Sequence, residues 1–130
     1  MEHVDEALDN VPMRAMDRLY VGSVDSVYNE EALDRKHIGS VISLLGANEF
    51  EHLKPPGQKR HLRFALEDSP EANVLELLPS VLASIDRELK AENCVLVHCV
   101  AGRSRSVAVV MAWIIAKKDK NPREALDVIQ

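Results

Sequence analysis

A chain of 130 residues with 46% hydrophobic content can bury one core and leaves no room for a second domain of ordinary size. Its formal net charge of −5 at pH 7 disfavours general binding to nucleic acid or to an anionic membrane, because both partners reward a basic surface. No apolar run approaches the ~18 residues needed to span a bilayer, and the acidic residues 1–5 do not resemble a signal peptide. We therefore expect one domain over residues 1–130, without a nucleic-acid or membrane partner.

Strand-like and helix-like patterns alternate along the chain. Asn29 is a typical helix N-cap. Apolar residues from Val74 to Leu89 recur at helical spacing, with a kink or a break expected at Pro79. In chain order, we expect a helix at 30–36, a buried strand at 41–45, an irregular stretch at 46–59, a strand at 61–66, a helix at 73–90, a strand at 94–97, a buried helix at 107–118 and a last helix from 121. This alternation predicts an α/β fold.

The most informative segment is His-Cys-Val-Ala-Gly-Arg-Ser-Arg-Ser at residues 98–106, which lies between an expected strand and an expected helix. A loop that enters a helix N-terminus aims its backbone N–H groups into one concavity, where the helix dipole adds partial positive charge. The segment therefore predicts an oxyanion cradle that fits a phosphate. Its phosphate ligands are expected from Val100, Ala101, Gly102, Arg103, Ser104 and Arg105.

The side chains of this loop predict nucleophilic chemistry. Cys99 is the expected nucleophile, because a helix N-terminus and a guanidinium favour the thiolate form. Arg105 offers a planar fork that matches two phosphoryl oxygens. Ser106 can donate a hydrogen bond to the sulfur and so make it a better leaving group, whereas His98 is expected to orient the loop rather than to act as a base. Gly102 permits a backbone approach that a Cβ would hinder.

The string His-Cys-x-x-Gly-x-x-Arg-Ser at residues 98–106 resembles the signature of the cysteine-dependent protein tyrosine phosphatases, and Ala101 and Ser104 give it the form of the dual-specificity branch. Residues 19–23 resemble the opening strand of that family, and residues 38–44 resemble its second strand. The resemblance implies a central, mostly parallel, twisted sheet flanked by helices, with the Cys-x5-Arg loop between a strand and a helix. It also implies hydrolysis of phosphotyrosine and of phosphoserine or phosphothreonine in proteins, through a cysteinyl-phosphate and without a metal or another cofactor.

The resemblance further implies a general acid on a separate loop upstream of the cysteine. Asp68 follows the strand expected at 61–66 and stands in a turn, a position that suits a mobile loop. We prefer Asp68 to Glu67, which alternation along the strand would face the other way, and to Glu71. The nearby basic residues are expected to form a loop and a solvated strand face, with contact to an acidic substrate as the alternative: Lys59, Arg60, His61 and Arg63.

Other functions stay open. A phosphatase of phosphoinositides, of RNA 5′-phosphates or of glycans would use the same chemistry, although this loop lacks the lysines of inositide-selective relatives. A pseudophosphatase would bind phosphoproteins without turnover. A rhodanese-type sulfurtransferase also places a cysteine loop before a helix, but Arg105, Ser106 and Asp68 favour phosphoryl transfer.

The two cysteines do not predict a disulfide, because an extended strand from Cys94 to Cys99 separates their Cα atoms by ~16 Å. Cys94 is expected to be a small core residue. The reactive thiol needs a reducing compartment, so a cytoplasmic location is expected, with the nucleus as a second one. The histidines and cysteines show no metal-ligand spacing. Relatives usually continue beyond the point where this chain stops, Gln130, which leaves a monomer or a weak homodimer as the expectation.

Overall fold

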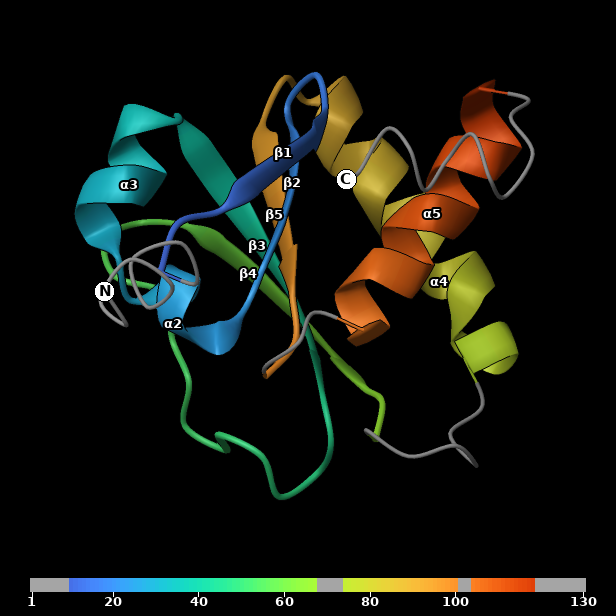
Figure 1. Cartoon of the computed structure of the whole chain (residues 1–130), viewed down its shortest axis with the longest axis horizontal. Helices are drawn as coiled ribbons and strands as arrows, with labels where there is room; N and C mark the ends of the chain where they lie inside the picture. Colours follow the sequence, from blue (N-terminus) through green and yellow to red (C-terminus); the bar gives the residue numbers. More distant parts are fainter. Residues whose placement is uncertain (1–9, 68–73, 101–103, 119–130) are drawn as a thin grey trace, which may run out of the picture.

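The alternating pattern of the sequence folds into a sheet with helices on both faces (Figure 1). The computed structural model describes residues 10–67, 74–100 and 104–118. Its elements are β1 Met13–Met16, β2 Leu19–Gly22, α2 Val24–Val27, α3 Glu30–Arg35, β3 Ile38–Leu45, β4 Arg60–Ala65, α4 Val74–Lys90, β5 Cys94–His98 and α5 Ser104–Lys118. The α/β class is confirmed. None of the helices in these ranges is long and apolar enough to cross a membrane.

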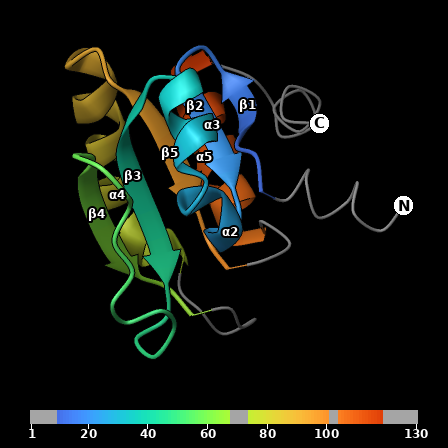
Figure 2. The same cartoon turned by 90° about the vertical axis from the view of Figure 1, so that its left-hand side faces the viewer.

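The sheet has the strand order β1-β2-β5-β3-β4. β2, β5, β3 and β4 run parallel, and only β1 pairs antiparallel, with β2. The mostly parallel sheet implied by the family resemblance is therefore confirmed. Figure 2 shows these parallel strands pointing the same way, so their carboxyl ends meet at one edge of the sheet. Ligand sites of α/β proteins lie at this edge.

β5 is buried on both faces, which explains its uninterrupted apolar sequence. Val95 and Val97 pack into the core beneath α4 and α5, whereas Leu96 packs into the core beneath α2 and α3. Because both faces are covered, the register of β5 is fixed, and its carboxyl end holds the next residue, Cys99, in a defined place.

Most element boundaries agree with the pattern in the sequence. Asn29 caps α3 as predicted, because its side chain accepts a hydrogen bond of 3.1 Å from the backbone N–H of Ala32. α4 continues through Pro79, so the alternative of a break there was wrong. β3 begins at Ile38, as the family resemblance implied, and α5 begins three residues before its predicted start, at Ser104.

Candidate active site

Three of the catalytic candidates lie at the junction where β5 ends and α5 begins. Cys99 follows β5 directly and is fully buried, while Arg105 and Ser106 lie on the first turn of α5 and are also buried. The backbone around Cys99 is attached to the end of β2: Cys99 N–H donates to the Gly22 carbonyl at 3.4 Å, and Val24 N–H donates to the Val100 carbonyl at 3.0 Å. Of the expected phosphate-binding residues, Ala101, Gly102 and Arg103 lie outside the described residues.

The structure brings Ser106 to the sulfur of Cys99. Cys99 Sγ and Ser106 Oγ are 3.6 Å apart, within hydrogen-bond distance for sulfur, and both side chains are shielded from solvent. A hydroxyl donor at this position stabilises negative charge on sulfur, whether the thiolate is attacking or leaving. The geometry is the one that the proposed role of Ser106 requires.

His98 is held by hydrogen bonds at both ring nitrogens. Nδ1 lies 3.0 Å from the Cys99 carbonyl oxygen, and Nε2 lies 2.6 Å from Ser43 Oγ. Burial lowers the pKa of His98 to about 4, with smaller lowering from the charges of His61, Arg63 and Arg105, so the ring is neutral near pH 7. Because a carbonyl can only accept, Nδ1 carries the proton and Nε2 accepts from Ser43. His98 therefore orients the carbonyl of the nucleophile and has no lone pair facing the site.

Arg105 is anchored by a carboxylate that the sequence patterns did not indicate. Its Nη1 donates to Glu49 Oε1 at 2.7 Å and to the Leu66 carbonyl at 2.8 Å, and Nη2 lies 3.4 Å from Glu49 Oε2. The hydrogen bond from Arg105 is the main cause that lowers the pKa of Glu49; the Gly46 N–H and the charges of Arg105 and Arg63 add to it, and burial opposes it. Glu49 is therefore ionised near pH 7 and fixes the plane of the guanidinium.

The general-acid assignment stays a prediction, because Asp68 and Glu71 lie outside the described residues. Glu67 is described, and its carboxylate accepts a hydrogen bond of 3.0 Å from the N–H of Ala47. A Cβ on Gly46 would collide with this carboxylate, so glycine allows the contact. The Glu67 carboxylate thus lies on the turn after β3.

The basic residues of the β4 region all have partners within the chain. Lys59 Nζ lies 2.8 Å from Asp34, and Arg60 Nε lies 2.8 Å from the buried Glu88. His61 Nε2 lies 2.8 Å from Ser43 Oγ, and Arg63 donates to backbone carbonyls. These contacts favour structural roles over the alternative contact with an acidic substrate.

The two cysteines are not joined to one another. Cys94 and Cys99 are both free and lie at opposite ends of β5. Across residues 10–67, 74–100 and 104–118, no three histidine, cysteine or acidic side chains gather as a metal site.

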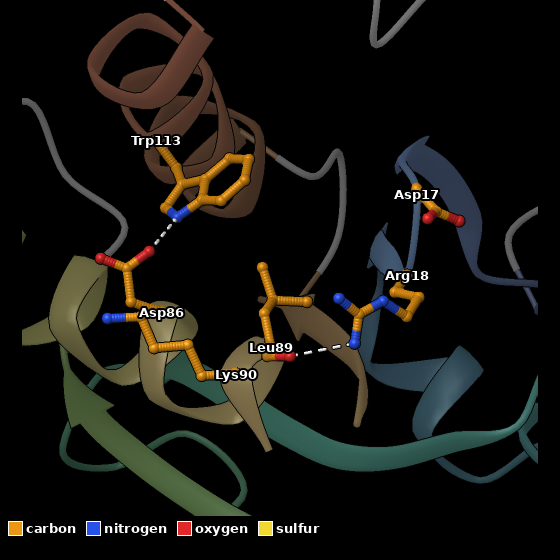
Figure 3. Close-up of a pocket in the computed structure, with 6 residues that line it drawn as sticks. All are labelled: Asp17, Arg18, Asp86, Leu89, Lys90 and Trp113. Atoms are coloured by element: carbon orange, nitrogen blue, oxygen red, sulfur yellow. Dashed lines mark hydrogen bonds between the residues drawn. The ribbon is translucent and has the colours of Figure 1, made fainter. Parts of the chain in front are cut away.

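A separate cavity of about 330 Å³ lies at the other edge of the sheet (Figure 3). Arg18, just before β2, donates to the Leu89 carbonyl near the end of α4 at 2.9 Å. Trp113 Nε1 donates to Asp86 at 2.9 Å, and Lys117 lies 2.8 Å from the same carboxylate. These pairs tie α4 to α5 and to β2, so the cavity marks a structural junction.

Comparisons with known proteins agree with the fold. The family "Dual specificity phosphatase, catalytic domain" matches residues 19–130. Human dual specificity protein phosphatase 16 is 31% identical over 114 residues, which cover 88% of this chain and 17% of that protein. The MAP kinase phosphatase with leucine-rich repeats protein 2 of Dictyostelium discoideum is 34% identical over 118 residues, which cover 91% of this chain and 16% of that protein.

The fold has equally clear counterparts among solved structures. The human tyrosine phosphatase-like serine/threonine/tyrosine-interacting protein superposes with a TM-score of 0.84 at 27% identity, covering 93% of this chain and 83% of that chain. The chain spans less than a third of the curated relatives that it matches. The family match covers most of the sequence, and the chain therefore belongs to the dual specificity phosphatase catalytic domain family.

Proposed function

We propose that this chain is a protein phosphatase that hydrolyses phosphotyrosine and phosphoserine or phosphothreonine through a cysteinyl-phosphate. The observation that carries the proposal is the arrangement at the β5–α5 junction. A buried cysteine has a serine hydroxyl 3.6 Å from its sulfur, and an arginine on the same helix turn is oriented by Glu49. One strand and one helix thus hold the three side chains that are proposed as nucleophile, leaving-group stabiliser and phosphate-binding cation, which supports the proposal.

In the first step, the guanidinium of Arg105 and the loop amides hold the phosphoryl oxygens while Cys99 Sγ attacks phosphorus. The P–S bond forms as the P–O bond to the substrate breaks, and Asp68 donates its proton to the departing oxygen. In the second step, a water molecule attacks phosphorus and gives its proton to the Asp68 carboxylate. The P–S bond then breaks, Ser106 stabilises the departing thiolate, and inorganic phosphate is released.

The sequence-based expectations about context are part of this proposal. A reactive thiol persists in a reducing compartment, which supports a cytoplasmic location with the nucleus as a second one. The substrate is a phosphorylated protein, and the proposed state of the domain is a monomer or a weak homodimer.

The decisive experiment compares the wild-type chain with Cys99→Ser and with Cys94→Ser as the matched control. Wild type and Cys94→Ser should release phosphate from phosphotyrosine and phosphothreonine peptides. Cys99→Ser should bind these peptides without turnover, because the phosphate cradle and Arg105 remain. Binding without turnover in the wild type would instead identify a pseudophosphatase. Turnover only of a phosphoinositide, an RNA 5′-phosphate or a glycan phosphate would identify the alternative substrates.

A further inference from the structure

Arg63 on β4 closes a clamp on the backbone turn at residues 46–50. Its Nη2 donates to the carbonyls of Gly46 at 3.0 Å and Glu49 at 2.6 Å, and its Nη1 donates to the carbonyl of Phe50 at 2.7 Å. One guanidinium thus satisfies three carbonyls that converge on it. Convergence of this kind requires a planar group with several donors, which arginine alone provides.

The turn at residues 46–50 contains a backbone conformation that is unfavourable without supporting contacts. Phe50 has φ +47, in the left-handed region that a bulky side chain rarely adopts. Left-handed backbone at a residue other than glycine costs free energy and persists only where surrounding contacts enforce it. The hydrogen bond from Arg63 to the Phe50 carbonyl is such a contact.

The same turn sets the direction of the Glu49 carboxylate. Glu49 N–H donates to the Gly46 carbonyl at 3.1 Å, and Gly46 N–H donates back to Glu49 Oε1 at 2.7 Å. Oε1 is also the atom that accepts from Arg105 Nη1 at 2.7 Å. A change in the turn therefore moves the oxygen that orients the guanidinium of Arg105.

We propose that Arg63 is a positioning residue for Arg105, acting through the turn at 46–50 and through Glu49. The inference rests on the proposed function, in which Arg105 binds the phosphoryl oxygens. Arg63 itself need not touch the substrate: all three of its carbonyl contacts lie in the turn, and this turn carries the carboxylate that orients Arg105.

The test uses Arg63→Gln, with Arg60→Gln as a matched control on the same strand. Arg60 is also exposed and hydrogen-bonded, but its partner is Glu88, whose other partners are Ser40 and Asn93. Each variant is assayed with an aryl phosphate for kcat and KM, and with inorganic phosphate as a competitive inhibitor. Thermal unfolding of the same samples reports stability.

We expect Arg63→Gln to lower kcat/KM by about 10-fold and to weaken inorganic phosphate binding by a similar factor, within the ~10²-fold that a 1 Å misplacement can cost. Arg63→Lys should recover part of the loss, because an ammonium donates to carbonyls but lacks the planar fork. Arg60→Gln should lower the melting temperature and leave kcat/KM within about 2-fold of wild type. In a variant that already carries Glu49→Gln, adding Arg63→Gln should lower kcat/KM by less than about a further 2-fold, because both changes remove the same support of Arg105.

Equal kcat/KM in Arg63→Gln and Arg60→Gln would overturn the inference, as would additive losses in the double variant. Failure of the proposed function looks different: the wild type would then hydrolyse none of the phosphate esters. Phosphate binding in that case still tests the clamp, since Arg63→Gln must weaken it and Arg60→Gln must not.

Discussion

Glu49 puts a negative charge beside the arginine that is proposed to bind phosphate, which at first sight opposes the binding of a dianion. Both anions can bind to Arg105, because a guanidinium has five N–H donors and can hold a carboxylate on one edge and phosphoryl oxygens on another. The Arg105 side chain is only 5% exposed, against 31% for Glu49. Without the carboxylate, a buried cation would lose a counter-charge that lies within hydrogen-bond distance.

Glu49→Gln should therefore reduce catalysis although it removes a charge that repels the substrate. Hydrogen bonds to charged groups contribute about 1.5–3 kcal/mol, so we expect kcat/KM to fall by roughly 10- to 100-fold. Because the pKa of Glu49 is lowered from 4.5, the pair is intact from about pH 5 upwards and is lost as pH falls through the folded-state value. The ratio of kcat/KM between Glu49→Gln and wild type, measured by steady-state kinetics, should accordingly be constant between about pH 5 and 8. A variant as active as wild type would show that repulsion outweighs orientation.

Asp68→Asn tests the assignment that depends most on the family resemblance. A general acid matters most when the leaving group is poor, because an unprotonated alkoxide is far less stable than an activated phenoxide. Phosphothreonine peptides should lose the most activity, phosphotyrosine peptides less, and an aryl ester of a very acidic phenol least. The basic limb of the pH–rate profile should flatten in the variant. A uniform loss with an unchanged basic limb would direct the search to Glu67 and Glu71.

Among the elements, those with long periodic patterns were predictable from the pattern, β2 was predicted from the family resemblance, and β1 and α2 were not predicted. The helical spacing from Val74 to Leu89 predicted α4 almost to its ends. β1 and α2 have four residues each, too few for any periodicity to emerge. Within the site, the motif at residues 98–106 predicted Cys99, Arg105 and Ser106 as candidates. Glu49 lies in the irregular stretch after β3, and its pairing with Arg105 depends on strand order, which no local pattern contains.

The end of α4 places a residue other than glycine in a left-handed conformation. Asn93 N–H bonds to the Glu88 carbonyl at 3.1 Å and Glu92 N–H to the Leu89 carbonyl at 3.0 Å, which is a Schellman motif. Its left-handed position, usually glycine, is occupied by Glu92 with φ +65.

Glu92→Gly should therefore stabilise the protein by about 0.5–1 kcal/mol, the left-handed strain relieved less the extra entropy of glycine in the unfolded chain. Glu92 is exposed, so no buried contact is lost. Ala91→Gly is the control: Ala91 has no positive φ, and glycine there should destabilise. Urea unfolding of the three proteins measures both effects. A Glu92→Gly variant no more stable than wild type would show that the motif stores no strain.

At the scale of the whole molecule, a chain of hydrogen bonds crosses three strands beneath the site. His61 on β4 lies 2.8 Å from Ser43 on β3, which lies 2.6 Å from His98 on β5. Since His98 Nε2 accepts the Ser43 proton, Ser43 must accept from His61 Nε2. Each of the three side chains donates one hydrogen bond to the next group. This series of hydrogen bonds therefore fixes the strands relative to one another and orients the backbone of Cys99.

These hydrogen-bonded histidines should make the free energy of unfolding fall as acid is added, over a pH range that the histidine pKa values set. Burial lowers the pKa of His98 from 6.5 to about 4, and burial with the charge of Arg63 lowers that of His61. Below pH 6.5 the unfolded chain binds protons that the native ring cannot accept, so stability is complete above 6.5 and is lost as pH falls towards the folded-state value. For His98 the loss is on the order of 2 kcal/mol by about pH 4.5. The pKa values of Glu49 and Glu88 are lowered from 4.5, so these carboxyl groups reduce the free energy of unfolding mainly below about pH 4.5. The histidine effect is therefore measured above that pH.

Urea unfolding of wild type, His98→Gln and His61→Gln across this window measures the effect as a slope of the unfolding free energy against pH. His98→Gln should flatten the slope strongly and His61→Gln weakly, whatever each change costs in stability near neutral pH. The slope is separate from that cost, because an amide does not titrate. If His98→Gln retained the full wild-type slope, the buried ring would not be the group that acid titrates on unfolding, and its assignment as the neutral donor to the Cys99 carbonyl would be wrong.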